Sequence, residues 1–471
     1  MKLYKRIAEE MQKEGIFLNV SDVYKFQEEW LQWYKGYVPT FHKYKMKVNG
    51  INKSFERKTL NLAKKFCEDM AKLLWTEKTT ISLDNDEKTK ALWDILDSKE
   101  NSFTVNFGNF IERTLAIGTG VTVEYQDETG KILIDYIDGN MVIPYKYTNS
   151  YISGLITVSR MNEGKKWYSQ LTIHEITDTK YIRRNKLYES ENENDIGKEI
   201  SLELKYPNVK EVEEIATTKS RFQVLKPNIV NNIDLQTPMG ISLYANCIDM
   251  FKSADTKYDG LFNEFVLGRK RILVDKTAMK ATTNVNEKGE VEHVQYFDEN
   301  DIAYVAIAGM EEQPVKEIDF SLRTEAFIKA INTDIDYASS NMGLGANWLK
   351  FDGAGVKTAT EVISENSEAF RTKKHNDTIV TNLIYDLVAA ICEMAGIETS
   401  EIKIETDDSI IEDKEAERVK AQSEVVQGLR SKTNYLTEIR GLTEQEAAEE
   451  IAQMQAEKQA AMALEIDNME E

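Results

Sequence analysis

The sequence predicts an α+β protein in which helices come first, an antiparallel sheet follows, and long helices form most of the rest. Two changes of periodicity carry this prediction. As far as Ile117, apolar residues recur every three or four positions, which is the spacing of one helix face. From Val121 they alternate with other residues, as in strands, and after Pro238 the helical spacing returns. Helices followed by a run of strands are typical of the α+β class.

The composition is that of a globular protein. The chain has 471 residues, of which 41% are hydrophobic, and a mean hydropathy of -0.47. It has room for roughly three domains. No apolar run approaches the roughly 20 residues that span a bilayer, and the chain begins with an amphipathic helix instead of the apolar segment of a signal peptide. The composition is therefore typical of a cytosolic protein, and we expect no membrane partner.

Cysteine and histidine usage predicts no metal site and no cofactor. Cys67, Cys247 and Cys392 are far apart, and each lies among apolar residues on an expected helix. This pattern indicates buried, reduced thiols. The four histidines are scattered without the spacing of metal ligands.

The formal net charge of -21 at pH 7 limits the kind of nucleic-acid contact to expect. Because phosphate contacts need lysine and arginine, it argues against a protein that grips nucleic acid over its whole surface. It does not exclude a protein that lets DNA slide past, since an acidic surface repels phosphate and offers a moving duplex no strong binding sites. Charge alone leaves both options open, together with a plain acidic soluble protein.

Residues 1–235 are expected to form one α+β domain. Helical patterns cover residues 1–40, 55–77, 87–96 and 103–117, and Ser21-Asp22 is an N-cap signal within the first of them. Alternation then predicts strands over residues 121–125, 132–136, 141–147, 154–160, 167–175 and 181–188. The turn residues Asp127-Glu128-Thr129-Gly130 make the first two strands a hairpin.

A pair of helices flanks an insert in the next part of the chain. Pro238-Met239-Gly240 is expected to open a helix that ends at Gly268, and a second helix follows from Ser321 to Met342. Between them lies a small α/β insert with apolar strands at 272–274 and 302–307. We expect the two helices to lie side by side and antiparallel, with the insert at one end.

A glycine-rich loop, Gly343–Gly355, separates the second of these helices from a much longer one. Its four glycines break the helical pattern because glycine loses the most backbone entropy on ordering and readily takes positive φ. Helical spacing resumes at Thr358 and ends at Gly396, a plausible C′ glycine. At about 1.5 Å per residue this helix would be about 58 Å long. The tail from Ile411 is helical and charged.

The catalytic motifs that come closest to a match all fail. Gly353-Ala354-Gly355-Val356-Lys357-Thr358 resembles the end of a phosphate-binding loop, but Val356 stands where glycine is needed and no buried strand precedes it. Gly343-x-Gly345 lacks the third glycine of a dinucleotide site. The carboxylate pairs Asp334/Asp336 and Asp407/Asp408 do not face each other on a helix and indicate solvated charge. The sequence predicts no enzyme.

The order of these elements resembles that of the portal proteins, or head-to-tail connectors, of tailed bacteriophages and prophages of Gram-positive bacteria. The resemblance covers nearly the whole chain and rests on residues 30–36 (WLQWYKG), 57–69 (RKTLNLAKKFCED) and 237–242 (TPMGIS), and on the helix, glycine-rich loop and long helix just described. It implies a portal-type fold whose subunits form a ring, commonly of twelve. The ring surrounds a channel for double-stranded DNA at one capsid vertex.

Carried over by position, the resemblance implies a division of the chain into the parts of a portal subunit. These are a β-rich wing (1–235), a stem helix (236–267), a clip (268–320), a second stem helix (321–341), a tunnel loop (342–357), a long helix and further wing (358–410), and a crown (411–471).

The resemblance also implies residues that face DNA. In the tunnel loop these would be Gly343, Leu344, Gly345, Asn347, Trp348, Lys350, Phe351, Gly353, Gly355 and Lys357. Lys329, Asn332 and Asp336 are candidates for the bore, on the helix face opposite Ile328 and Ile335, although solvent or intersubunit contacts explain them equally well. Arg269, Lys270 and Arg271 are candidates for the clip entrance, or for ion pairs with a neighbouring subunit.

The implied partners are other copies of the chain, double-stranded DNA, the terminase large subunit, head-completion or adaptor proteins, and the major capsid and scaffold proteins. The implied location is the virion, with assembly in the host cytoplasm. The function expected is DNA packaging, retention and ejection. The alternatives are an acidic adaptor or scaffold module without a channel, which docks partners on the long helix, and a nucleotide-binding enzyme built on Gly353–Thr358.

Overall fold

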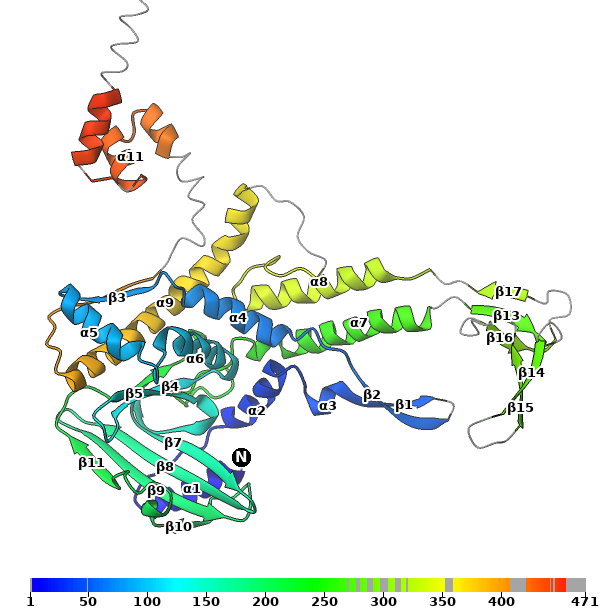
Figure 1. Cartoon of the computed structure of the whole chain (residues 1–471), viewed down its shortest axis with the longest axis horizontal. Helices are drawn as coiled ribbons and strands as arrows, with labels where there is room; N and C mark the ends of the chain where they lie inside the picture. Colours follow the sequence, from blue (N-terminus) through cyan, green and yellow to red (C-terminus); the bar gives the residue numbers. More distant parts are fainter. Residues whose placement is uncertain are drawn as a thin grey trace, which may run out of the picture.

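The computed structural model describes most of the chain, namely residues 2–48, 50–268, 271–276, 280–285, 291–296, 304–309, 315–318, 321–351, 359–406, 421–440, 442–443 and 445–454. The expected class is confirmed, because helices come first, antiparallel sheets follow, and long helices come after them (Figure 1).

Helices form the first part of the core. They are α1 (Lys2–Gln12), α2 (Val23–Tyr34), α3 (Pro39–His42), α4 (Leu62–Leu74), α5 (Asp86–Leu96) and α6 (Phe103–Ile117). The predictions for 87–96 and 103–117 are confirmed. The faces of α4 and α6 bury Phe66, Phe107 and Phe110 completely, and Gly118, with φ +89°, ends α6. Burial of large aromatic side chains makes this helical layer a main source of stability.

A hairpin occupies residues that were expected to begin a helix. β1 (Lys43–Val48) pairs antiparallel with β2 (Ile51–Glu56). The helix predicted over 55–77 was therefore wrong for residues 55–61, since α4 begins only at Leu62. Asn61 has φ +52°, and the Leu60 N–H donates to Asp255 Oδ1 far along the chain. These two features hold the segment away from helical geometry.

Two antiparallel sheets follow α6 and confirm all six predicted strands. The smaller sheet has the order β12 (Phe222–Leu225), β4 (Gly120–Gln126), β5 (Ile132–Asp138). The larger one has the order β10 (Lys198–Ile200), β9 (Tyr181–Ser190), β8 (Lys166–Ile176), β7 (Tyr151–Glu163), β6 (Val142–Thr148), and β11 (Val212–Ile215) also pairs with β9. A separate pair joins β3 (Thr80–Leu83) to β18 (Ile402–Glu405), so a strand near residue 400 returns to the N-terminal part.

The helix expected from Gly240 starts later. Residues 238–244 are irregular, a short 3-10 turn covers Ala245–Cys247, and α7 is Ile248–Leu267. The reason lies in backbone hydrogen bonds to the end of α6. The Gly240 N–H donates to Thr119 Oγ1 at 3.0 Å, and the Leu243 N–H donates to the Leu115 carbonyl at 2.8 Å. These N–H groups anchor the segment to α6 and do not start a helix.

α7 and α8 (Thr324–Asn341) form the expected antiparallel pair (Figure 1). The residues in contact follow one another in opposite order along the two helices, as in an antiparallel pair. Cys247 Sγ approaches the Ala338 carbonyl at 3.7 Å, Lys257 Nζ donates to Asp334 at 2.5 Å, and Glu264 pairs with Arg323 at 2.8 Å. The described parts of the insert at the far end are strands: β13 (Arg271–Asp275), β14 (Lys280–Val285), β15 (Val291–Tyr296), β16 (Tyr304–Ile307) and β17 (Val315–Ile318).

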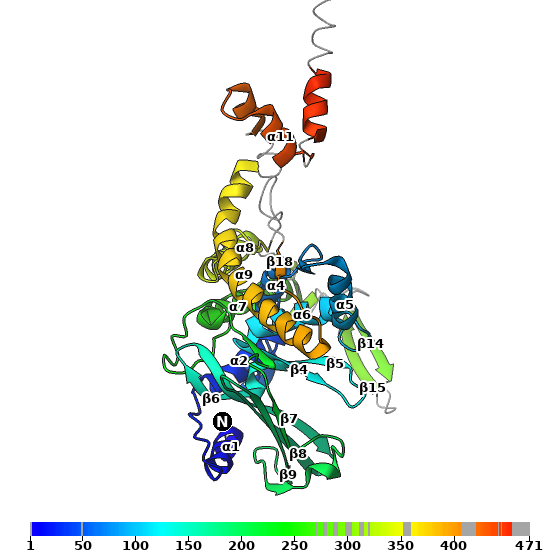
Figure 2. The same ribbon diagram turned by 90° about the vertical axis from the view of Figure 1, so that its left-hand side faces the viewer.

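The long helix is confirmed as α9 (Ala359–Ala395), with Gly396 at φ +67° after its last turn. α9 packs against α4, β4 and β12, and Figure 2 shows it running past α4 and β4. The expectation that no apolar run could span a bilayer needs a correction, because the helical segment Glu368–Ala395 is long enough and its most apolar 18-residue window has a mean hydropathy of 1.5. Half of its most apolar window is buried inside the fold, as in the core helix of a globular protein.

The predicted burial of the three cysteines is confirmed. Cys67 lies on α4, Cys247 ends the turn before α7, and Cys392 is near the end of α9. In the described C-terminal part, α11 (Lys432–Glu438) begins with a Ser431 cap whose Oγ accepts from the Asn434 N–H. Residues 411–420 and 455–471 of the predicted crown lie outside the described residues, as do residues 407–410 just before it.

Candidate functional site

The three bore candidates lie together on one face of α8. Lys329, Asn332 and Asp336 line a groove with Glu325, Ile328, Thr333 and Lys350. The opposite side of α8 buries Ile331 and Ile335 in the core. Ile328 was expected on the opposite face, and this expectation was wrong: Ile328 lines the groove, because Asn332 lies one helical turn further along, next to it. The groove is therefore a polar face that the helix pair leaves uncovered.

The start of the glycine-rich loop folds back onto this groove. Lys350 Nζ lies 2.7 Å from Asp336 Oδ2, and the Asn347 N–H donates to Asp336 Oδ1 at 3.0 Å. One turn away, the Phe351 N–H donates to Asn332 Oδ1 at 2.8 Å. Two bore candidates thus hold three residues that were predicted as DNA-facing parts of the loop.

Side chains of the loop also reach three other helices. Trp348 Nε1 donates to Asp69 of α4 at 3.1 Å, and the Phe351 ring meets Tyr258 of α7 edge-on at 5.8 Å. Gly343 has φ +74° and lies so close to α9 that an added Cβ would be 2.3 Å from Thr372 Oγ1. This approach requires glycine, because any larger residue would clash and be strained.

Leu344 was expected among the DNA-facing residues of the loop, and the structure corrects this expectation. Its side chain is only 1% exposed and belongs to the core. Gly345, with φ +84°, reverses the chain after it. The described half of the loop, residues 343–351, is therefore a packed segment, whereas Gly353, Gly355 and Lys357 lie outside the described residues.

Of the clip-entrance candidates, the structure places one. Arg271 is exposed at the first position of β13, opposite Ile318 of β17. Arg269 and Lys270 lie outside the described residues. An exposed arginine beside the end of α7 can meet either a phosphate or a carboxylate of another molecule.

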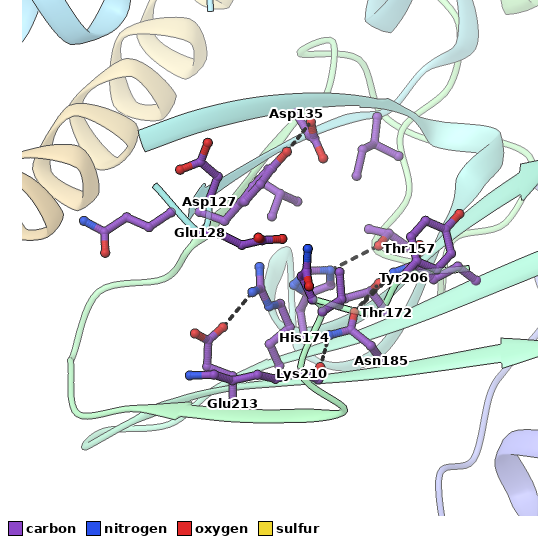
Figure 3. Close-up of a pocket in the computed structure, with 18 residues that line it drawn as sticks. Asp127, Glu128, Asp135, Thr157, Thr172, His174, Asn185, Tyr206, Lys210 and Glu213 are labelled. Carbon is purple, nitrogen blue, oxygen red and sulfur yellow. Dashed lines mark hydrogen bonds and ion pairs between the residues drawn. The ribbon is translucent and has the colours of Figure 1, made fainter. Parts of the chain in front are cut away.

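Sequence analysis missed a polar cavity between the two sheets (Figure 3). His174 is buried there, with Nε2 3.1 Å from Thr157 Oγ1 and Nδ1 2.6 Å from Tyr181 Oη. Arg183 and Glu213 form an ion pair of 2.7 Å at its edge. Burial, reinforced by the charge of Arg183, lowers the pKa of His174 to about 3, so this histidine is neutral at neutral pH.

A buried carboxyl group lies next to this cavity. Burial raises the pKa of Glu124 on β4 to about 7. Its Oε1 accepts from Thr122 Oγ1 at 2.8 Å, and Arg221 joins the same layer to Glu393 of α9 at 3.1 Å. The polar residues Thr122 and Glu124 alternate with Val121 and Val123, which are also buried, and this pattern is the sequence signal of a strand covered on both faces. Because the groups bond mainly to each other, the arrangement serves to join sheets and helix.

Comparison with known protein families identifies the family of this chain. Residues 23–463 match the family model described as phage portal protein, SPP1 Gp6-like. The chain belongs to this portal protein family. The protein is thus a phage portal subunit, part of the ring-shaped channel at a capsid vertex through which double-stranded DNA is packaged, retained and ejected, and the adaptor alternative is not favoured. The family is structural rather than enzymatic and is associated with the virion.

Solved structures similar to the portal chain come from gene transfer agent particles. They include the neck of a native particle computed with C12 symmetry, with 9% identity over 80% of this chain and 89% of that chain and a TM-score of 0.42. A virion of a native particle (11%, 81% and 88%, 0.39) and the neck of an empty particle computed with C6 symmetry (10%, 81% and 88%, 0.41) are also similar. Comparison with curated proteins gives no match.

Proposed function

We propose that twelve copies of this portal subunit close into a ring whose staves are the α7–α8 pairs, with the groove face of α8 toward the bore. The observation that carries this proposal is the location of the polar groove. α8 buries Ile331 and Ile335 in the core, and its residues Lys329, Asn332 and Asp336 line a groove onto which the first half of the glycine-rich loop folds. Helices packed laterally in this way suit a closed ring.

The charges of the groove suit a duplex that must keep moving. Lys350 is already paired with Asp336, and Lys329 and Glu325 carry opposite charges on the same face. A surface of nearly balanced charge attracts phosphate weakly and without regard to sequence. DNA would therefore pass without stalling.

The loop is proposed to act mechanically. Its first half, residues 343–351, is anchored to α8, α4, α7 and α9 by the contacts described above, so the DNA contact would come from Gly353, Gly355 and Lys357. Trp348, Lys350 and Phe351 would support that contact by fixing the start of the loop. Leu344, which is buried, has no part in touching DNA.

The remaining parts are proposed to meet other components of the particle. The strand-rich insert, with Arg271 at its first strand, would form the clip that receives the terminase large subunit and later the head-completion proteins. The sheets of residues 1–235 would form the wing against the major capsid and scaffold proteins, and the C-terminal helices the crown. Assembly would take place in the host cytoplasm.

Light scattering and negative-stain imaging of the purified full chain test the ring. We expect closed rings with a central hole and a mass about twelve times the 54.0 kDa of one chain. A species that stays monomeric at all salt concentrations, with scaffold protein present, would contradict it.

A further inference from the structure

The β1–β2 hairpin leaves the body of the subunit and has two chemically different faces. In the described residues it forms a two-stranded sheet of its own. Its register pairs Tyr44 with Phe55, so these two share one face with Met46 and Ile51, and with Lys53 opposite Met46. The other face carries Lys43, Lys45, Lys47, Asn52, Ser54 and Glu56. One face of the hairpin is thus mainly apolar and the other is basic.

The base of the hairpin is fixed to α7. Tyr44 Oη donates to Asp259 at 3.3 Å, and His42 Nε2 lies 3.3 Å from Asp255 Oδ2. The Arg57 guanidinium lies 4.6 Å from the ring of Tyr44. The hairpin therefore points in a set direction, along the side of α7 away from α8 (Figure 1). It is held at one end only.

The outer half of the hairpin is apolar and uncovered. Met46 is 52% exposed and Ile51 is 64% exposed. The outer half of α7 is similar, with Phe262 50% and Phe265 53% exposed, and Lys58, which follows the hairpin, places its Nζ 5.3 Å from the Phe262 ring. We call these four exposed apolar side chains, Met46 and Ile51 of the hairpin and Phe262 and Phe265 of α7, the hairpin surface. An isolated two-stranded hairpin is marginally stable in water, and such exposed apolar groups mark an interaction site.

Charge indicates what covers this surface. Residues 43–58 contain five lysines and one arginine against the single acid Glu56, whereas the whole chain carries -21. A basic arm on an acidic protein is complementary to another copy of the same protein. DNA is a weaker match for two reasons. The hairpin lies on the α7 side of the helix pair, whereas the proposed bore lies along α8. Its exposed apolar residues, Met46 and Ile51, also form no favourable contact with phosphate.

We propose that the β1–β2 hairpin grips the stem of the adjacent subunit, with the hairpin surface buried in the contact between the two copies. This inference rests on the proposed ring. In a closed ring every subunit offers this surface to one neighbour and receives the neighbour's hairpin on its other side, so no hairpin remains uncovered.

Site-specific photocrosslinking tests the contact in the full-length protein. The three native cysteines are buried, so Ile51→Cys can be labelled selectively with a maleimide-benzophenone, and unmodified protein shows the background. Rings are assembled from equal amounts of isotopically heavy and light subunits and irradiated. We expect covalent dimers that join heavy to light chains, with adducts within 248–267 or 324–341. Lys45→Cys, on the basic face, is the matched control and should give at least fivefold less.

The outcomes separate this inference from the ring itself. Three outcomes would overturn the hairpin contact while leaving the ring proposal intact. In each, rings form, but crosslinks are absent, occur only within one chain, or join the hairpin to added duplex DNA instead of a neighbouring subunit. Failure of the unmodified protein to form rings would contradict both the proposed ring and the proposed hairpin contact.

A second pair of variants gives a readout without labelling. Met46→Glu with Ile51→Glu should raise the protein concentration needed for ring formation at least tenfold. Lys45→Ser with Lys47→Ser removes charge that attracts the acidic neighbour but keeps the apolar contact, so it should raise this concentration by a clearly smaller factor. Circular dichroism melting checks that both variants are folded. An equal effect of both pairs, or no effect of the first, would contradict the proposal.

Discussion

Lys350 and Asp336 join the glycine-rich loop to the middle of the second stem helix, with Nζ 2.7 Å from one carboxylate oxygen and 2.9 Å from the other. Both side chains are mostly shielded, at 21% and 28% exposed. The same carboxylate accepts from the Asn347 backbone N–H. The ion pair therefore sets where the loop starts relative to the proposed bore.

Removing this pair should loosen the start of the loop. Lys350→Ala is expected to cost about 0.5–1.5 kcal/mol, the range for a partly buried, hydrogen-bonded pair. It should also speed amide hydrogen exchange over residues 343–351. Hydrogen-exchange mass spectrometry checks this, with Lys329→Ala, an exposed lysine of α8 that lines the same groove, as control. Equal protection in the two variants would show that packing of Trp348 and Leu344 holds the segment without the ion pair.

Gly343 should tolerate no side chain, because φ is +74° and a Cβ would meet Thr372 Oγ1 at 2.3 Å. Gly343→Ala is expected to lower the free energy of unfolding by about 2–4 kcal/mol, from backbone strain and the clash together. Gly396→Ala is the matched control, since φ is +67° but nothing lies within 4 Å. It should cost only about 1 kcal/mol. Urea denaturation of both variants measures the difference, and equal losses would contradict the packed geometry at Gly343.

Glu124 should make stability depend on pH. Its folded pKa, raised to about 7 by burial, lies above the unfolded value near 4.5. Between these pH values the unfolded chain loses the proton and the folded chain keeps it, so stability falls as pH rises, by up to about 3 kcal/mol. Glu124→Gln should abolish this slope and gain stability relative to the native protein from pH 4.5 to 7. Melting curves across that range check it, and parallel curves would refute it.

His174 should act in the opposite direction on the acid side. Its folded pKa, lowered to about 3, lies below the unfolded value of 6.5. The unfolded chain takes up a proton first as pH falls, so stability decreases from pH 6.5 down to 3. Replacing His174 with Gln should flatten this part of the melting profile while leaving the slope assigned to Glu124. An unchanged acid limb would mean that other groups dominate it.

The second half of the loop should matter for DNA and not for assembly. Gly353→Ala with Gly355→Ala restricts the backbone there and is expected to leave rings intact while reducing packaging or retention of DNA. Gly164→Ala, in the turn between β7 and β8 with nothing within 4 Å, controls for the loss of a glycine elsewhere. Packaging assays measure the effect, and normal packaging by the loop variant would count against a mechanical loop.

The sequence predicted well those elements that local periodicity defines. Phe103–Ile117 and the wing strands follow helical and alternating patterns, and α9 was placed to within one residue at each end. It failed where distant residues decide the backbone. Gly240 and Leu243 bond to the end of α6, and Leu60 bonds to Asp255, so neither segment could continue a helix. Asn49-Gly50 between alternating residues was a hairpin signal that went unused.

The candidate site was predictable in outline only. The spacing of Lys329, Asn332 and Asp336 placed them on one side of a helix, and the structure brings them together. No local pattern distinguishes Leu344, which is buried, from an exposed apolar residue of a flexible loop. The ion pair of Lys350 with Asp336 depends on a chain reversal at Gly345, which sequence spacing does not specify.

An electron cryomicroscopy reconstruction of the ring formed by the purified full chain tests the central claim most directly. The account predicts a closed ring in which Lys329 and Asn332 of every α8 face the central channel and the Lys350–Asp336 pair lies next to the constriction formed by the second half of the loop. A ring in which the groove face of α8 is buried against a neighbouring subunit, or turned to the outside, would contradict it.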